Sequence, residues 1–479
     1  MSIQIQDSLR RRKAPFRPLV PGQVSLYVCG PTVYDDCHIG HLMGPVIFDA
    51  IARWFRSRGY LVRFVNNITD IDDKIIQRAL KSGEPWLAIT QRYTAQYFEF
   101  LKKLHVVTIT DHPRCTEYID EMIAFVEELI AADRAYKTSD GVYYDIQRQE
   151  HYGKLSGRKL DEMLSGVRVE RSEELRHPAD FALWKLAKPG EPTWESPWGA
   201  GRPGWHLECS VMSSSLLGQA FDIHGGGDDL KFPHHENEIA QSEALGHSYA
   251  QCWMHNGLIQ YGGVKIAKSD PRMKDPEFAR QFQAAWLLDT YGAPTIRFFL
   301  LQGHYRSPVD FKPENLQAAR AGLARLLKQL GALAEEADET NAEEVFARTL
   351  PLPLAERRAA YCEALDDDFS TGRALGHVFA LLNDAKKLAG KEQHEALRLV
   401  RDLGRLLGLF LPGDAAQIAD DEAHHGELFE QVMSFVLTLR QEARARKDFA
   451  LSDRIRDGLA ALDIHVEDKA GSSTWRVGS

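Results

Sequence analysis

The chain has 479 residues, of which 44% are hydrophobic and 26% are charged, and its formal net charge is −10. This length allows several domains with a large core, and the acidic balance disfavours a protein that coats nucleic acid indiscriminately. Six cysteines are too few for a disulfide framework, and the sequence shows neither an apolar run long enough to span a membrane nor a secretion signal. We therefore expect a cytoplasmic protein with no membrane span.

The N-terminal part has the pattern of a parallel sheet. Residues 24–28 resemble a buried strand, residues 42–58 carry apolar side chains at helical spacing, and residues 60–65 resemble a second strand. Gly59 ends the helical run. A strand, a helix and a strand of these lengths predict a βαβ unit in a parallel sheet.

The middle of the chain changes character twice. Residues 115–203 are rich in Pro, Gly and charged residues, which indicates an insertion into the sheet domain. Residues 221–246 then predict a short strand, a glycine run and a helix that has Pro233 in its first turn and ends at Gly246. The stretch TDIDDK, at 69–74, is acidic enough for a metal site but is more simply a capped helix start.

The C-terminal third is predominantly helical. From about residue 314 the pattern is rich in Ala, Leu, Arg and Glu, while the polar stretches 335–345 and 412–427 are typical of exposed connections. A long amphipathic helix is predicted from about residue 428, followed by a basic helix at 448–462 and a short strand-like tail.

Four residues have the right chemistry for a zinc site. Zinc binds thiolate, imidazole and carboxylate groups, and the candidates are Cys29, Cys209, His234 and Glu238. Cys29 follows the first strand, where a parallel sheet forms its ligand crevice, and the His–Glu pair has helical i, i+4 spacing. Spacing alone still favours buried cysteines and a surface His–Glu contact. A protease-type HExxH helix is excluded because Ile239 stands four residues after His235.

Several ordered motifs then point to one family. CHIGH at 37–41 resembles the HIGH element of class I aminoacyl-tRNA synthetases, and KIAKS at 265–269 resembles their KMSKS loop. The sequence also contains, in this order, the motifs YVCGPTVYD, NITDIDDKII, GWHLECSVMS and FDIHGGGDDLKFPHHENEIAQSEA. With these motifs it resembles the cysteinyl-tRNA synthetase family over nearly its whole length.

The resemblance implies an α/β fold. A Rossmann-type parallel-sheet catalytic domain with an inserted subdomain is followed by a helical bundle and a small C-terminal anticodon-binding domain. We place these domains at residues 1–313, with the insertion near 115–203, at 314–411 and at 428–479.

The resemblance also implies an amino-acid site. The family places its zinc on the residues matching Cys29, Cys209, His234 and Glu238, and the metal binds the substrate thiol in preference to the hydroxyl of serine. The residues expected to bind cysteine are Cys29, Gly30, Thr32, Thr69, Trp205 and His206. Helix capping by Thr69 and core packing by Trp205 are the competing interpretations.

An ATP site is expected beside the zinc. His38 and His41 precede a helix N-terminus, which favours phosphate, and Gly40 allows a close approach. The family resemblance adds Gly226 and Gly227 beside the adenosine, Asp229 on the ribose, and Lys265 and Lys268 as catalytic cations, with Mg²⁺ carried by ATP. Ile266 and Ala267 depart from the usual KMSKS residues, and Cys37 has no expected role.

The expected partners are ATP, L-cysteine and tRNA(Cys), whose terminal ribose would accept cysteine, and the protein is expected to be a monomer. Family positions suggest anticodon contacts by Arg444, Phe449, Asp453 and Asp468, against the alternative of an ordinary surface helix and turn. One rival function is that of a related ligase that joins activated cysteine to an amino sugar. That ligase lacks a C-terminal anticodon-binding tail. Another is a non-catalytic RNA-binding protein, which would be expected to have lost some of the zinc ligands or the lysines of the KIAKS loop.

Overall fold

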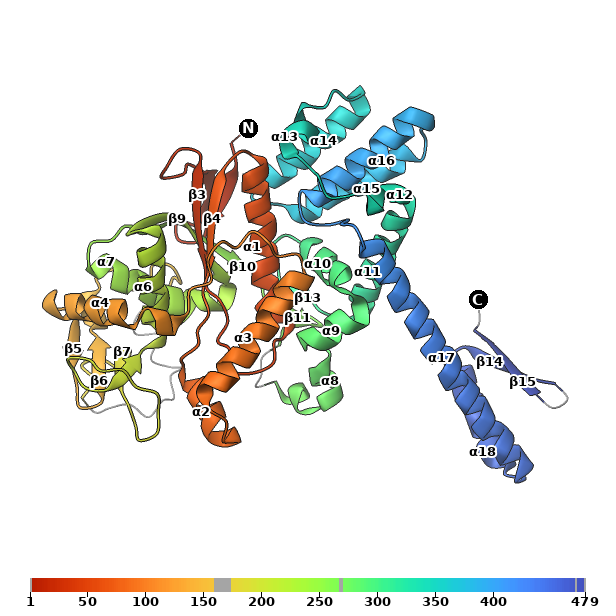
Figure 1. Ribbon diagram of the computed structural model, residues 1–479, viewed down its shortest axis with the longest axis horizontal. Helices are drawn as coiled ribbons and strands as arrows, with labels where there is room; N and C mark the ends of the chain where they lie inside the picture. Colours follow the sequence, from red (N-terminus) through yellow and green to blue (C-terminus); the bar gives the residue numbers. More distant parts are fainter. Residues whose placement is uncertain (1, 159–173, 267–269, 470–471, 478–479) are drawn as a thin grey trace. The chain divides into compact units, whose positions relative to one another are not determined.

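The core of the molecule is a parallel four-stranded sheet. The computed structural model describes residues 2–158, 174–266, 270–469 and 472–477 (Figure 1). Within them, the sheet has the order β10-β9-β3-β4, with all neighbours parallel. Its strands are β3 (Gln23–Val28), β4 (Leu61–Asn66), β9 (Ala220–Gly227) and β10 (Tyr249–Asn256). The predicted βαβ unit is confirmed, with α1 (Ile39–Ser57) connecting β3 to β4.

Helices cover both faces of this sheet. Figure 1 shows α1 and α10 (Ala293–Leu301) on one side, and α6 (Trp205–Leu217) and α7 (Glu236–Ala244) on the other. Because both faces are covered, β9 and β10 are buried along almost their whole length rather than at alternating positions. The carboxyl ends of β3, β4, β9 and β10 therefore meet at one edge of the sheet, the usual place for a ligand site.

The segment before α7 differs from the prediction. The glycine run lies inside β9, and Pro233 is not in the first turn of the helix. A π-helical turn at Lys231–His235 precedes α7, and Phe232 within it is extended (φ −140°, ψ 131°). The reason is steric, because a proline ring disfavours the helical conformation at the preceding residue. The predicted end at Gly246 is confirmed by its left-handed φ of +79°.

The predicted insertion contains a separate sheet. Residues 115–203 include α4 (Ile119–Ala131) and, in their described part, an antiparallel sheet of order β5-β6-β7-β8. The strands are β5 (Ala135–Lys137), β6 (Gly141–Tyr144), β7 (Phe181–Leu186) and β8 (Gly201–Pro203). Buried side chains of this sheet, of α4 and of α6 form one hydrophobic cluster, so the insertion packs directly on the sheet domain.

The chain separates into two compact units, Met1–Ala415 and Ala416–Ser479. The first unit also contains a hairpin, two helices that follow β4, a small sheet beside the KIAKS segment and the helical segment. Its remaining principal elements are β1 (Gln4–Asp7), β2 (Arg12–Pro15), α2 (Asp73–Ser82), α3 (Trp86–Lys103), β11 (Ile259–Tyr261), β12 (Val264–Lys265), β13 (Val309–Asp310), α8 (Pro276–Arg280), α9 (Ala284–Tyr291), α11 (Pro313–Leu330), α12 (Ala332–Glu335), α13 (Ala342–Ala347), α14 (Leu352–Asp366), α15 (Thr371–Ala385) and α16 (Gly390–Arg405). The boundary between domains at residue 313 stays a prediction.

The TDIDDK stretch is a helix start, as expected. Asp72 is the N-cap of α2, and its side chain accepts a hydrogen bond from the Lys74 backbone N–H at 2.8 Å. This satisfies one of the free N–H groups of the first turn. The acids of this stretch therefore have a structural explanation.

The second unit is a small helix-and-hairpin structure. It holds most of α17 (Asp414–Ala445), α18 (Phe449–Ala461), β14 (Ile464–Lys469) and β15 (Ser472–Val477). The predicted exposed connection at 412–427 is wrong, because from Asp414 onward it is part of α17. Its Ala and Glu residues are strong helix formers, and this preference outweighs the acidic, polar composition.

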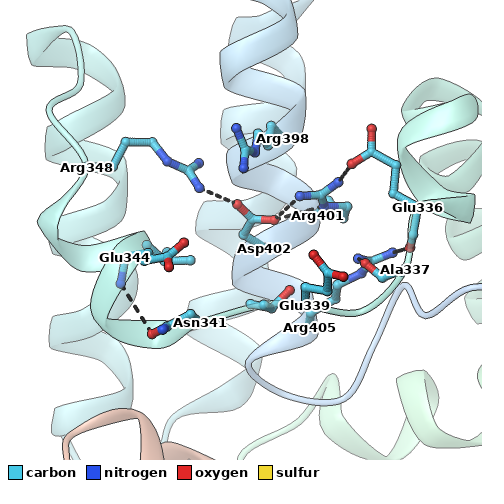
Figure 2. Close-up of a pocket in the computed structure, with 12 residues that line it drawn as sticks. Glu336, Ala337, Glu339, Asn341, Glu344, Arg348, Arg398, Arg401, Asp402 and Arg405 are labelled. Carbon is cyan, nitrogen blue, oxygen red and sulfur yellow. Dashed lines mark hydrogen bonds and ion pairs between the residues drawn. The ribbon is translucent and has the colours of Figure 1, made fainter.

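The helical segment of the first unit contains an arginine-rich cavity of about 210 Å³ (Figure 2). Asp402 is buried there and accepts hydrogen bonds from Arg348 and Arg401, both at 2.8 Å, while Arg401 also contacts Glu336. The guanidinium of Arg405 donates to the backbone carbonyl of Glu336 at 2.8 Å and to others nearby. This network ties the predicted connection at 335–345 to α16.

In the described part of the chain, no helix is long and apolar enough to cross a membrane.

Candidate functional site: a thiolate and imidazole cluster beside a helix-capping histidine pair

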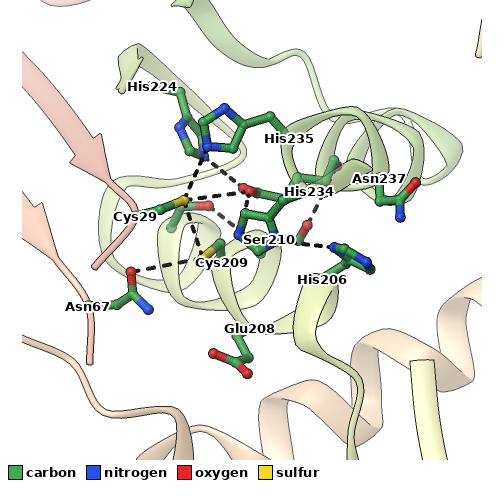
Figure 3. Close-up of polar contacts among 12 residues, drawn as sticks. Cys29, Asn67, His206, Glu208, Cys209, Ser210, His224, His234, His235 and Asn237 are labelled. Atoms are coloured by element: carbon green, nitrogen blue, oxygen red, sulfur yellow. Dashed lines mark hydrogen bonds and ion pairs between the residues drawn. The ribbon is translucent and has the colours of Figure 1, made fainter. Parts of the chain in front are cut away.

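Four predicted metal ligands meet at the carboxyl edge of the sheet (Figure 3). Cys29 directly follows β3, Cys209 lies in the second turn of α6, His234 lies in the π-helical turn, and Glu238 lies in α7. The candidate donor atoms all lie within 4.8 Å of one another. Side chains 209 positions apart in the sequence therefore come together only through the fold.

The separations between donors suit a tetrahedral zinc ion. Cys29 Sγ is 3.6 Å from Cys209 Sγ, and His234 Nε2 is 3.2 Å from Glu238 Oε1. Tetrahedral geometry with ordinary Zn–S and Zn–N/O bonds requires about 3.8 Å and about 3.4 Å for these pairs. Two thiols, an imidazole and a carboxylate are also a chemically suitable set. The residues present fit the metal that the family resemblance implies.

Burial and pairing control the ionisation of the two thiols. Burial, together with the neighbouring Cys209, raises the pKa of Cys29 well above its usual value. Burial also opposes ionisation of Cys209, but the hydrogen bond from Cys29 and the nearby His234 lower the pKa of Cys209 to about 6. One thiolate is thus already favoured at neutral pH, and a bound cation would favour the second.

A second donor set overlaps the first and was missed in the sequence. Cys29, Glu238, His224 and His235 also satisfy the distance criterion. His224 Nε2 lies 2.7 Å from Glu238 Oε2, and Tyr249 donates its hydroxyl hydrogen to that same oxygen at 2.7 Å. Both groups hold Glu238 so that Oε1 faces Cys29 and His234. A buried histidine in the apolar strand β9 was the available signal.

The backbone around Cys29 explains Gly30 and Thr32. A Cβ on Gly30 would lie 1.6 Å from the carbonyl oxygen of Asn67, so only glycine allows this approach of the two strand ends. Gly30 donates its N–H to Asn67 Oδ1 at 2.8 Å. Thr32 and Thr69 form a parallel β-bridge. The segments after β3 and β4 are therefore joined beside the candidate metal ligands.

Thr69 does not cap a helix through its side chain. It is buried and donates its hydroxyl hydrogen to Glu208 Oε2 at 2.6 Å. Burial and the neighbouring Cys209 raise the pKa of Glu208 well above its usual value. The contact with Glu208, a residue that the sequence analysis did not select, fixes the rotation of the Thr69 hydroxyl, and the Thr69 oxygen also accepts from Asn67 Nδ2 at 3.3 Å.

Trp205 and His206 directly contact His234, one of the four candidate metal ligands. Trp205 is 37% exposed, so core packing does not explain it, and its ring stacks on His234 at 4.4 Å between centroids. His206 Nδ1 lies 3.1 Å from His234 Nδ1. Burial and the nearby His234 hold the pKa of His206 well below its usual value, so neutral His206 can accept the hydrogen on His234 Nδ1.

The two histidines of CHIGH form the start of α1. His38 is the N-cap and accepts from the Gly40 N–H through Nδ1 at 3.1 Å, while His41 lies in the first turn. The two rings stack at 3.8 Å. The sequence analysis placed both before the helix, and the structure corrects this for His41. The pair therefore borders the helix end that favours anions.

The remaining ATP-site candidates lie partly within the structure. Lys265 Nζ lies 3.5 Å from Asp229 Oδ2, and both side chains are about half exposed, so this pair is easily exchanged for other partners. A Cβ on Gly226 would lie 2.8 Å from the His235 ring, and one on Gly227 would lie 2.7 Å from Asp229 Oδ1. Lys268 and Ala267 lie outside the described residues.

Cys37 is separate from the cluster. Its side chain is buried, and burial together with Asp36 raises the pKa of its thiol to about 12. A thiol of this kind is neither a nucleophile nor a ready metal ligand. That Cys37 has no role stays a prediction.

The four anticodon candidates belong to the second unit. Phe449 begins α18 and is 60% exposed, and Arg444 lies exposed in the last turn of α17. Asp453 forms an ion pair with Arg456 at 3.2 Å, and Asp468 lies in β14. An exposed aromatic ring suits stacking on a base, but these contacts remain predictions.

Comparison with known proteins decides the family. Residues 15–321 match the model of the tRNA synthetases class I (C) catalytic domain, residues 360–411 the DALR domain, and residues 435–476 the cysteinyl-tRNA ligase anticodon binding domain. The chain is 44% identical to the cysteine–tRNA ligase of Geobacter metallireducens, with 100% of both chains covered. It is 42% identical to that of Thermococcus onnurineus, with 99% of both covered.

The chain belongs to the cysteine–tRNA ligase family. It is therefore a class I aminoacyl-tRNA synthetase by family, which confirms the predicted fold class and enzyme class. The fold is also similar to the methionyl-tRNA synthetase of Mycobacterium tuberculosis in complex with methionyl-adenylate. That likeness has a TM-score of 0.56 at 16% identity and covers 83% of this chain and 93% of the other. The roles of individual site residues in this ligase-family chain stay predictions.

Proposed function

We propose that this chain joins L-cysteine to the 3′ end of tRNA(Cys) at the cost of ATP, and that a zinc ion binds the substrate thiol. The observation that carries the proposal is the cluster of Cys29, Cys209, His234 and Glu238 beside the histidine pair of α1. A chain of this family with that donor set has both a thiol-selective site and a phosphate-binding helix end. We further propose that it acts in the cytoplasm as a monomer.

Selectivity against serine is the task of the donor cluster. A pocket that reads only size separates near-isosteres by factors of about 10–200. Zinc, when bound, supplies a borderline-soft Lewis acid that prefers the thiolate of cysteine to a neutral hydroxyl. Cys29, Cys209, His234 and Glu238 would hold it. His224 and Tyr249 keep the second oxygen of Glu238 occupied, which supports a single donor oxygen on the metal side.

Thr69 and its neighbours would orient the amino-acid backbone. Because Thr69 donates its hydrogen to Glu208, its oxygen can accept from the ammonium group of cysteine. Gly30 and Thr32 line the same junction of strand ends, and Trp205 and His206 cover the cluster from α6. These contacts would fix the carboxylate for reaction, which is the main requirement of the first step.

The first step would form cysteinyl-adenylate. A carboxylate oxygen attacks the α-phosphorus of ATP, the bond to the bridging oxygen breaks, and Mg²⁺-bound pyrophosphate leaves. No base is needed because the carboxylate is ionised at pH 7. His38, His41, Lys265 and Lys268 would stabilise the charge on the phosphates, Gly40, Gly226 and Gly227 would border the nucleotide, and Asp229 would accept from the ribose hydroxyls.

The second step would transfer cysteine to tRNA. A terminal ribose hydroxyl, the 2′-hydroxyl in class I enzymes, attacks the carbonyl carbon, AMP leaves with the bonding electron pair, and the hydroxyl proton passes to the phosphate of the departing AMP. Arg444, Phe449, Asp453 and Asp468 would contact the anticodon. The match of residues 435–476 to an anticodon-binding domain supports this reaction over the amino-sugar ligase.

The test combines zinc content with two reactions. Purified wild-type protein should contain one zinc per chain and catalyse cysteine-dependent ATP–pyrophosphate exchange without tRNA. Cys209→Ser should lose zinc and most of its discrimination between cysteine and serine. Cys362→Ser, a half-buried thiol in α14, is the matched control and should keep both. Zinc-replete wild-type protein without exchange, or a Cys209→Ser protein with full zinc and full discrimination, would refute the proposal.

A further inference from the structure

Four consecutive basic residues, at 10–13, form a basic turn that ends the connection from β1 and includes the first two residues of β2. Residues 10–13 are all exposed, although the chain as a whole has a net charge of −10. Arg10 pairs with Asp7 at 3.4 Å, and Lys13 pairs with Asp367. Within the described part of the chain, neither Arg11 nor Arg12 forms an ion pair. Two guanidinium groups thus remain available to an anionic partner.

Hydrogen bonds place this turn next to the amino-acid site. Ser8 donates its N–H to the Trp253 carbonyl at 2.8 Å, and its hydroxyl lies 2.8 Å from His255 Nδ1. His255 Nε2 lies 2.8 Å from His235 Nδ1. Figure 3 shows the next contact, in which His235 Nε2 lies 3.4 Å from Cys29 Sγ. Three contacts therefore connect the base of the basic turn to the first candidate zinc ligand.

The turn also borders the inserted segment. The Arg11 guanidinium occupies the space beside Gly157, because a Cβ on that glycine would lie 2.3 Å from Arg11 Nη2. Gly157 belongs to a turn whose neighbour Ser156 donates its N–H to Glu236 at 2.8 Å, and Glu236 begins α7. The basic turn therefore lies between strand β10 and the insertion, at the rim of the site.

We propose that the Arg10–Lys13 turn binds the phosphate backbone of the tRNA acceptor arm, with Arg11 and Arg12 as its phosphate contacts. The proposal rests on the proposed function, since the tRNA 3′ end must reach the cysteine site and the adjoining RNA must cross its rim. A chain of net negative charge binds RNA through local basic patches. Contacts to phosphate position the RNA without reading its sequence.

Salt dependence of tRNA binding is the direct test. The double variant Arg11→Gln/Arg12→Gln removes two phosphate contacts, and each contributes about 0.7–0.9 to the slope of log Kd against log salt. Wild-type affinity should therefore fall about 7-fold to 12-fold more between 50 and 200 mM KCl than the affinity of the variant, since a fourfold salt change is raised to a power of about 1.4–1.8. The same difference is expected for cognate and non-cognate tRNA.

A charge-matched control separates a local contact from net charge. Arg325→Gln/Lys391→Gln removes two exposed cations from α11 and α16 and should keep the wild-type slope. ATP–pyrophosphate exchange needs no tRNA and should be unchanged in both variants, which also reports on folding. A turn variant that keeps the wild-type slope, or a control variant that loses as much slope as the turn variant, would overturn the proposal. Absence of ATP–pyrophosphate exchange in the wild-type protein would instead count against the proposed function. The two failures can be told apart because the Kd for tRNA is measured without catalysis.

Discussion

A buried carboxylate gives the sharpest test of how the first unit is held together. Asp49, on α1, is fully buried, and its Oδ1 accepts from the backbone N–H groups of Val107 and Thr108 at 3.0 and 3.1 Å. Its Oδ2 accepts from Arg53 at 2.7 Å and from Arg297, which is also buried. Arg297 donates in turn to the carbonyl oxygens of Leu104 and Leu407 at 2.8 and 2.7 Å. One carboxylate therefore links α1, α10 and the turn after α16.

Asp49→Asn should destabilise the protein by about 3–5 kcal/mol, the usual cost of leaving one member of a buried ion pair unpaired. The amide that replaces the carboxylate would keep one oxygen as an acceptor. Its NH2 group would face N–H groups that now donate to the second oxygen of Asp49. Such a loss is a large part of the total stability of a domain, about 5–15 kcal/mol. Urea denaturation at pH 7, followed by circular dichroism, measures it.

The same group predicts a pH dependence with a definite sign. Burial alone would raise the pKa of Asp49, but Arg297 and Arg53 outweigh it and lower the pKa to about 2. The unfolded carboxyl group, with a pKa of about 3.9, binds more protons between these values. Its contribution of about 2.6 kcal/mol is therefore present above about pH 4 and is lost as the pH falls toward 2. Asp49→Asn should show less loss of stability over that range.

Asp111→Asn is the matched control, because the Asp111–Arg63 pair has a contact of 3.2 Å but is partly exposed. Pairs of that kind contribute about 0–1 kcal/mol. Equal small losses for Asp49→Asn and Asp111→Asn would refute the reasoning, since burial would then make no difference.

Three further predictions concern the site and the RNA partner. Cys37→Ala should keep exchange activity within about twofold and lose about 1 kcal/mol of stability, because the thiol is buried packing; a large loss of activity in a folded protein would contradict this. Tyr249→Phe should weaken zinc binding by about 10-fold to 100-fold in chelator competition, since Glu238 loses its hydroxyl partner. Tyr144→Phe, which removes a buried hydroxyl bonded to a backbone carbonyl, should not, and equal affinities for the two would rule out the positioning role. Phe449→Ala should weaken tRNA binding by about 1–3 kcal/mol and leave exchange unchanged, whereas Leu462→Ala, a change at another exposed apolar residue of the same unit, should leave both tRNA binding and exchange unchanged; wild-type affinity in Phe449→Ala would argue against stacking.

Local patterns predicted the fold better than they predicted the surroundings of the site. The βαβ unit, the capped start of α2 and the turn at Gly246 follow from short-range spacing and from single glycines or caps. The error at Pro233 arose because a helix-favouring position for proline competes with the restriction that proline places on Phe232. The error at 412–427 arose because polar composition indicates exposure but does not exclude a helix.

The residues that orient the ligands were not predictable from spacing. His224 and Tyr249 reach Glu238, and Glu208 reaches Thr69, across strands and helices that pair only in the folded chain. The four candidate ligands could be named because zinc accepts few residue types, but the family resemblance was needed to prefer a metal site to ordinary packing. Partners of ligands have no such restriction, since any buried hydrogen-bonding group can serve.

The two overlapping donor sets can be ranked by what already occupies their members. His224 is committed to Glu238 Oε2, and His235 shares a hydrogen bond with His255, which itself contacts Ser8. A metal bound through His224 would have to break the contact that holds Glu238. A metal bound through Cys209 and His234 would break no such contact, because these side chains already face Cys29 and Glu238. The histidines of the second set thus support the first set, and His235 connects the candidate ligand cluster through His255 to Ser8 beside the basic turn.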